Sequence, residues 1–289
     1  MVDLSPYMRL AIDQARMSLR EGNCGFGAVI VKDDRLIARA RDAEKTAADP
    51  TAHAEITAIR MAAVQLGRDL SGAVLVCTHE PCPMCAAAML WSGIAEIAYG
   101  CSIKAAIAMG RRRIDLPCRE IYARAGRELI AHQGMLRTEC EILYNQEVRD
   151  RIDQLRDADQ SKLEALAREL STRREQWFST NSVSFESHSG DPIGRAYEVF
   201  LKKLGITAAE APVVHCDEAS LVLRSSNFCP TLEACRILDL DTRFVCRHLT
   251  EKPTTDLLRQ IHPKLRFTRN YESLRPNTPY CEEMIILDE

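Results

Sequence analysis

The 289-residue sequence lacks any apolar run that approaches the roughly 20 residues of a transmembrane helix. Its first residues, MVDLSPYMRLAID, also lack the basic stretch and unbroken apolar stretch of a secretory signal. Hydrophobic residues make up 46% of the chain and charged residues 27%, which is typical of globular proteins. We therefore expect a soluble, cytoplasmic protein with no membrane partner.

A strong net charge is missing too. The formal net charge of -3 gives no overall attraction to phosphate backbones, which argues against a nucleic-acid partner. The first half of the chain has one basic run, Arg111, Arg112 and Arg113. Such a run is usually a solvated face or a helix end.

Regular cysteine spacing is also absent. The 12 cysteines are irregularly placed in a long chain, which favours reduced thiols and a metal site over a disulfide framework. We interpret most of them as small buried side chains.

Helices and strands are predicted to alternate in the first half, which indicates a sheet covered by helices. A helix is expected from Ser5 to near Gly22, and a hairpin over 27–40 turns at Asp33 and Asp34. The remaining elements are a helix opened by residues 49–51 and ended by Gly67, an apolar strand over 73–78, a helix closed by Gly93, and a strand over 95–100.

The length exceeds the usual domain size of roughly 100–200 residues and predicts two domains. We expect a first domain over 1–144, a charged helical connector over 145–189, and a small α+β domain over 190–289. The apolar stripe of the connector either forms a dimer seam or packs on its own domain. The Ser- and Asn-rich segment near 179–190 is predicted to be the linker.

The last domain is expected to contain two helices and two strands. The helices lie around 193–204 and 232–238, and the strands around 221–224 and 284–287.

Two short segments carry the residues of a metal site. TAHAEITAIR places His53 and Glu55 at the start of one helix, and HEPCPMCAAA places Cys82 and Cys85 at the start of another. Cysteines three apart on a helix face the same way, and the helix start favours the thiolate that binds metal. A catalytic zinc takes three protein ligands of this kind and keeps its fourth position for water. We predict that His53, Cys82 and Cys85 bind one Zn²⁺ per chain.

Glu55 is not needed as a ligand. A carboxylate beside a catalytic zinc can take a proton from water and return it to the substrate, so Glu55 is the predicted catalytic residue. Taken alone, each segment has an ordinary alternative, since CxxC is often a structural half-site or a redox pair and HxE is common by chance. Together, and with a proline before the first cysteine, they match the signature of zinc deaminases.

Three segments follow one another within residues 5–144, namely GFGAVIV, DPTAHAEITAIR and EPCPMCAAAM. In this respect the sequence resembles the cytidine deaminase-like superfamily, and more closely its branch of guanine and cytosine deaminases and tRNA adenosine deaminases. The resemblance implies a three-layer α/β/α domain with a five-stranded mixed sheet, usually a homodimer. It also implies that an exocyclic amine is hydrolysed from a small heterocycle, with Phe26 as a pocket wall and the Ala54 amide touching the ring.

One position departs from this branch. Seven residues before Asp49, where those deaminases usually carry an asparagine that touches the base, the chain has Asp42. An ionised carboxylate only accepts hydrogen bonds. Asp42 is therefore predicted either to bind a substrate that offers a donor or a positive charge, or simply to cap a loop.

Three functions remain open at this point. The first is a hydrolase acting on a small heterocyclic amine such as a nucleobase. The second is RNA editing of a tRNA adenosine, which would need a basic path and aromatic stacking. The third is a catalytically silent interaction module, which the complete set of ligands and glutamate argues against.

The second domain contains residues that a metal or a nucleophile would use, without ligand spacing: His215, Cys216, Cys229, Cys235, Cys246, His248 and Cys281. The ordinary interpretation is a set of reduced cysteines in a small core. Residues 190–289 resemble the domain of bacterial aminothiazoline-carboxylate hydrolases in three segments, NFCPTLEAC, FVCRHL and YCEEMIIL. That resemblance implies a link to amidine-type rings.

Overall fold

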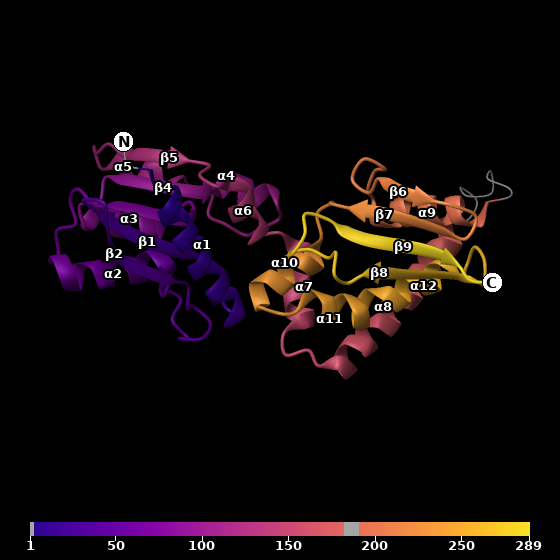
Figure 1. The fold of residues 1–289 in the computed structure, drawn as a ribbon. Helices are drawn as coiled ribbons and strands as arrows, with labels where there is room; N and C mark the ends of the chain where they lie inside the picture. The colour runs from indigo at the N-terminus through magenta and orange to yellow at the C-terminus, as the bar shows by residue number, and fades with distance from the viewer. Residues whose placement is uncertain (1–2, 182–190) are drawn as a thin grey trace. The chain divides into compact units, whose positions relative to one another are not determined.

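The structure is a computed structural model that describes residues 3–181 and 191–289 (Figure 1). It divides into two compact units, residues 1–153 and 154–289. Residues 182–190 of the predicted linker lie outside the described residues. Within the described ranges no helix combines the length and the apolar character that crossing a membrane requires.

The first unit is built on a five-stranded sheet of order β2-β1-β3-β4-β5. Strand β1 (Gly27–Lys32) pairs antiparallel with β2 (Arg35–Arg41) and with β3 (Val74–His79). Strands β3, β4 (Glu96–Cys101) and β5 (Ile130–Gln133) run parallel to one another. The predicted five-stranded mixed sheet is confirmed.

The helices of the first unit connect these strands, in the alternation that the sequence predicts. They are α1 (Ser5–Arg20), α2 (Ala54–Leu66), α3 (Pro83–Trp91), α4 (Ile103–Ala108), α5 (Cys118–Arg124) and α6 (Arg137–Ile142). Helix α7 (Gln146–Leu155) follows at the end of the unit.

Helices cover both faces of this sheet. Helix α1 lies so close to β1 that a Cβ on Gly27 would be 1.9 Å from the carbonyl oxygen of Ala11. Successive strand residues point to opposite faces, and Ala28 accordingly packs in a core with α2, α3 and α5, to which Met89 and Tyr122 belong. The unit therefore has the three predicted layers.

The second unit has an antiparallel sheet of order β6-β7-β9-β8. Its strands are β6 (Val213–Cys216), β7 (Ser220–Ser225), β8 (Leu265–Asn270) and β9 (Cys281–Leu287). Its helices are α8 (Gln160–Asn181), α9 (Pro192–Leu204), α10 (Pro230–Leu238), α11 (Thr242–Cys246), the π-helix η2 (Arg247–Glu251) and α12 (Lys252–Leu258). The predicted helices and strands of this half correspond to α9, α10, β7 and β9.

The division between the units lies earlier than the sequence suggests. Helix α8, predicted to be a solvated connector, packs against α12, with Ser171 Oγ donating to Asp256 Oδ2 at 2.7 Å. Phe178 is buried with Val199 and Leu257 in the same unit. The helix thus belongs to the second unit because its apolar side chains pack there.

Candidate metal centre and active site

Two helix N-termini hold the predicted metal ligands. His53 is the N-cap residue of α2 and Cys82 that of α3, both with extended backbone. Cys85 lies in the first turn of α3 and is fully buried. The turn before His53 is fixed by Asp49, whose Oδ1 accepts from the backbone nitrogen and hydroxyl of Thr51 at 2.8 and 2.7 Å.

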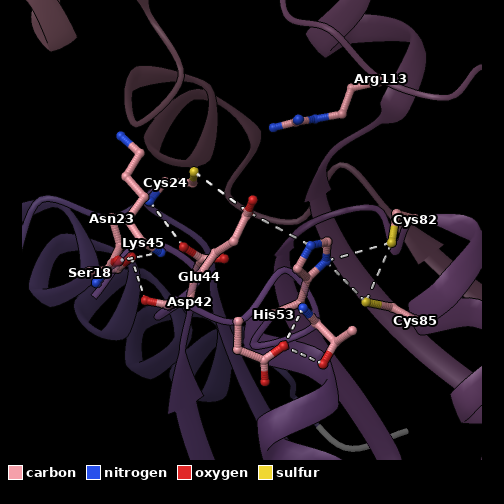
Figure 2. A network of polar contacts seen from close by, with 12 residues as sticks. Ser18, Asn23, Cys24, Asp42, Glu44, Lys45, His53, Cys82, Cys85 and Arg113 are labelled. Carbon is pink, nitrogen blue, oxygen red and sulfur yellow. Dashed lines mark hydrogen bonds and ion pairs between the residues drawn. The ribbon is translucent and has the colours of Figure 1, made fainter. Parts of the chain in front are cut away.

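The three ligand atoms form a small triangle (Figure 2). Cys82 Sγ and Cys85 Sγ are 3.6 Å apart, and they lie 3.6 and 3.4 Å from His53 Nδ1. Tetrahedral zinc, with bonds of about 2.3 Å to sulfur and about 2.0 Å to nitrogen, needs edges of about 3.5–3.8 Å. The triangle fits zinc and leaves one tetrahedral position for a non-protein ligand.

Without a metal, the three ligand side chains differ in how readily they lose a proton. The hydrogen bond from the Cys85 thiol lowers the pKa of Cys82 to about 4 and raises that of Cys85. The hydrogen bond to the Cys82 sulfur raises the pKa of His53 to about 9. Zinc must therefore displace protons from His53 and Cys85 when it binds.

Glu55 lies in the first turn of α2 and is 6% exposed. Burial, followed by the negative charge of Cys82, raises its pKa to about 7. The carboxylate lines the same cavity as His53 and Cys82. This placement suits a group that exchanges protons beside a metal.

The cavity has a volume of about 80 Å³. It gathers the predicted Phe26, His53, Glu55 and Cys82 with residues that the sequence does not single out. The full lining is Cys24, Phe26, Glu44, His53, Glu55, His79, Glu80, Cys82 and Arg113.

Aromatic rings form one wall of this cavity. Phe26 stacks on Tyr144 with centroids 5.3 Å apart and meets His79 edge-on at 5.4 Å. His79 Nδ1 is 2.7 Å from the carbonyl oxygen of Glu80 and so must be the donor, which leaves Nε2 as an acceptor. Nε2 is buried without a hydrogen-bond partner among the described residues, and burial lowers the pKa of His79 to about 4.

Glu44 lies on the side of His53 that faces away from the thiols. Its Oε2 is 4.0 Å from His53 Nε2 and 4.0 Å from Cys24 Sγ (Figure 2). Zinc-bound histidines commonly donate their second ring N–H to a carboxylate. Glu44 is placed for that role, although no local motif in the sequence marks it.

The other predicted substrate contacts are placed differently. Asp42 is fully buried and is not in the cavity lining; its Oδ1 accepts from the Cys24 backbone nitrogen at 3.0 Å, and burial raises its pKa. Oδ1 thus makes a loop contact, while Oδ2 is buried without a hydrogen-bond partner among the described residues. Ala54 is buried at the first position of α2, where helix N–H groups lack helical acceptors.

Glu80 is a functional residue that the sequence reasoning missed. It is 4% exposed, and its two oxygens accept from the backbone nitrogens of Ile103 and Cys118 at 3.0 and 3.1 Å. One carboxylate thus fixes the starts of α4 and α5. Its position two residues before Cys82 was the available signal.

Residues 1–101 match the family model of the cytidine and deoxycytidylate deaminase zinc-binding region. This part of the chain belongs to that family. The zinc-binding region contains His53, Cys82 and Cys85, so its cofactor is zinc and these are the candidate ligands. The match ends before the second unit, whose resemblance to aminothiazoline-carboxylate hydrolases stays a prediction.

Two curated relatives are similar over this zinc-binding region. A tRNA-specific adenosine deaminase of Agrobacterium fabrum is 44% identical over 101 residues, which are 35% of this chain and 66% of the relative. The guanine deaminase of Bacillus subtilis is 42% identical over 95 residues, 32% of this chain and 61% of the relative. The chain thus spans just under two thirds of their length.

A solved structure from a study of A-to-I editing by tRNA:A34 deaminases is 31% identical. The match covers 48% of this chain and 98% of that one, with a TM-score of 0.40.

Proposed function

We propose that the chain is a zinc-dependent hydrolase that removes an exocyclic amine, as ammonia, from a small nitrogen heterocycle. The observation that carries this proposal is the zinc-sized triangle of His53, Cys82 and Cys85 beside the buried carboxylate of Glu55. Three protein ligands with an open fourth position are typical of catalytic zinc. The names of the relatives, guanine deaminase and tRNA-specific adenosine deaminase, support the same reaction class.

Zinc bound here would lower the pKa of a coordinated water to roughly 7 and so supply a nucleophile at neutral pH. Glu55 would take the proton of that water and pass it to the ring nitrogen beside the reacting carbon. It would then move the second proton to the leaving amine. Ammonia leaves, and a carbonyl replaces the amine on the ring.

The remaining groups would orient the ring. Phe26 offers an aromatic face in the cavity, and the Ala54 amide lies beside His53 at the start of α2. Asp42 would position the cavity wall indirectly, because it accepts a hydrogen bond from the backbone of Cys24, which lines the cavity.

The size of the cavity favours a single ring. At about 80 Å³ it is far below the roughly 300–1,000 Å³ of sites that bury drug-sized ligands. A nucleobase or related amidine-type ring suits it better than several splayed nucleotides.

The alternative is a tRNA adenosine deaminase. The observation that favours it is the 44% identity with the tRNA-specific enzyme of Agrobacterium fabrum. It requires RNA to reach the cavity with one base flipped out of its stack.

A homodimer is the assembly we propose. On α2 and α3, which pack side by side, Val64 is 88% and Trp91 77% exposed. These two side chains are the positions that we propose to lie in the contact between subunits. Sedimentation of the Trp91→Glu variant as a monomer, and of the wild type as a dimer, would support this assembly.

We propose a cytoplasmic location on the evidence of the thiols. All 12 cysteines are free, as expected in a reducing compartment.

Ammonia release from the zinc-loaded protein tests the function. The panel contains guanine, cytosine, adenine, creatinine, aminotriazines, aminothiazolines and a tRNA wobble stem-loop. Release from one free ring that disappears in Glu55→Gln, but persists in the exposed control Glu218→Gln, supports the proposal. Activity confined to the stem-loop would establish the alternative.

The second domain is proposed to serve the same chemistry, on the resemblance of its sequence to aminothiazoline-carboxylate hydrolases. Loss of aminothiazoline turnover in a Cys281→Ala variant would support this idea, and unchanged turnover would contradict it.

A further inference from the structure

The loop between α4 and α5 carries the basic run Arg111–Arg113. Glu80 fixes the first residues of the two flanking helices, Ile103 and Cys118, and the Arg111 backbone nitrogen donates to the Ala106 oxygen at 3.0 Å. The sequence predicts a solvated face or a helix end here. In the structure the run follows the end of α4, and Arg113 lines the cavity beside Cys82.

Arg113 is held in place without being neutralised. Its guanidinium lies 4.8 Å from the centroid of Phe26, and Nη1 donates to the Arg112 carbonyl oxygen at 2.9 Å. Nη2 is buried and has no hydrogen-bond partner in the described part of the chain. A buried donor on a charged group that lacks an acceptor is costly, which indicates that a ligand supplies one.

Two more guanidinium groups reinforce this positive charge. Arg149 Nη1 donates to the carbonyl oxygen of Cys24, another residue of the cavity lining, at 3.0 Å. Arg111 is half-buried, and after burial itself the repulsion from Arg149 and Arg113 lowers its pKa. Within residues 3–181 and 191–289, no carboxylate lies within ion-pair distance of Arg111, Arg113 or Arg149.

A carboxylate is nevertheless available in the same cavity. Glu44 lines it together with Arg113, yet the two form no ion pair (Figure 2). Figure 2 shows Arg113 apart from the polar network that joins Asp42, Glu44 and His53. Glu44 lies within ion-pair distance of His53 and not of Arg113, so the positive charge of Arg113 faces the cavity of about 80 Å³ without a partner among the described residues and is complementary to an acidic group on a ligand.

We propose that Arg113 is a specificity-determining residue that binds an acidic substituent, a carboxylate or a phosphate, on the heterocyclic substrate. Arg111 and Arg149 strengthen the attraction, and the amine side of the ring faces the metal and Glu55. This inference rests on the proposed deaminase function and narrows its substrates to small anionic heterocyclic amines. Guanidinium groups suit such ligands because their paired N–H donors match the oxygens of carboxylate and phosphate.

The test compares neutral and anionic members of matched pairs. The pairs, each built on a single ring, are cytosine with 5-carboxycytosine, and 5-hydroxymethylcytosine with its phosphate monoester. We expect the anionic member to have the higher kcat/KM by at least about tenfold, the value of one charged hydrogen bond. The carboxylate and phosphate pairs separate the two sources of negative charge.

Variants assign the preference to one side chain. Arg113→Gln should reduce kcat/KM for the anionic member at least about tenfold more than for the neutral one. Arg112→Gln is the matched control, because Arg112 is exposed and contributes only its backbone carbonyl. Preference retained in Arg113→Gln, or lost equally in Arg112→Gln, would overturn the assignment.

Binding separates this inference from the proposed function. Calorimetric titration of zinc-loaded Glu55→Gln with the same pairs does not depend on turnover. Tighter binding of the anionic members that Arg113→Gln abolishes supports the inference, even where the wild type releases no ammonia and the proposed function fails. Three outcomes would overturn the inference. The first is turnover of neutral rings together with equal or weaker binding of the anionic ones. The others are no binding of any anionic member and binding of the tRNA stem-loop alone.

Discussion

One group of charged side chains from each unit can be compared. In the first, Glu55, Glu44 and Arg113 line one cavity, and Arg113 forms no ion pair there. In the second, Arg269 and Glu283 face each other across β8 and β9 with nitrogen and oxygen 3.0 Å apart, at 10% and 6% side-chain exposure. A charge paired inside a fold supports that fold, whereas a charge left unpaired beside a cavity indicates a ligand.

Cysteines differ in the same way. Cys82 and Cys85 meet a histidine at two helix starts, within 3.6 Å of one another. Cys235 and Cys246 are buried in the second unit, and no metal-like group that includes them is found in the part of the chain described by the structure. The position of a cysteine in the fold, rather than the number of cysteines, therefore indicates whether it can bind a metal.

Removing one of the two thiols of the metal centre should have the largest effect, a loss of bound zinc. Cys85→Ala is expected to lower the zinc content from about one per chain to near none and to abolish ammonia release, since two ligands do not hold a catalytic zinc. Elemental analysis after dialysis measures the zinc. Cys216→Ser, an exposed thiol of the second unit, is the control and should keep it. Full zinc in Cys85→Ala would contradict the proposed centre.

Breaking the paired charge should affect stability instead. Arg269→Met leaves Glu283 buried without its partner and is expected to lower the free energy of unfolding by about 3–5 kcal/mol. Denaturant unfolding measures this loss. The double variant Arg269→Met/Glu283→Leu should recover most of it, while zinc content stays unchanged. Loss of zinc in either variant would show that the two units are not independent.

His79 should link stability to pH. Its pKa is lowered to about 4 in the folded chain, below the ordinary 6.5, so its contribution is present above pH 6.5 and is lost as pH falls through 4. The loss amounts to at most about 3 kcal/mol. Unfolding of the zinc-free protein at pH 7 and pH 4 should show a smaller difference in His79→Gln. His262→Gln, in the second unit, should behave as the wild type.

Glu44→Gln should have the smallest effect. If the carboxylate orients the imidazole of His53, zinc affinity should fall by about tenfold while the ligands stay intact. Competition with a chromophoric chelator measures the affinity. Glu139→Gln removes an exposed carboxylate that pairs with Arg9 and is the matched control. Unchanged affinity in Glu44→Gln would leave that carboxylate to contact substrate only.

The sequence predicts what local spacing determines. His53, Glu55, Cys82 and Cys85 were found because each pair lies within one helical turn, and the mixed sheet follows from alternating elements. The roles of Glu44, His79 and Arg113 depend on which segments meet across the cavity, and no spacing encodes that.

The unit boundary illustrates the same limit. Charge density along α8 predicts a mostly solvated connector whose apolar stripe forms a dimer seam or packs on its own domain; in the structure apolar residues of α8 pack within the second unit. The sequence offers Asp42 as a substrate contact or a loop cap; in the structure Oδ1 accepts from the Cys24 backbone, and Oδ2 is buried without a hydrogen-bond partner among the described residues, so its contact with substrate stays a prediction.

Glu80, two residues before the metal ligand Cys82, holds the first residues of α4 and α5, the helices on either side of the loop that carries Arg113. A loop between two helices that one carboxylate anchors can exchange its side chains while the anchored residues keep their places. The residues that bind the metal and the loop proposed to determine substrate specificity are thus different parts of the fold. On the role proposed for Arg113, we expect substitutions within residues 109–116 to change substrate preference without loss of zinc.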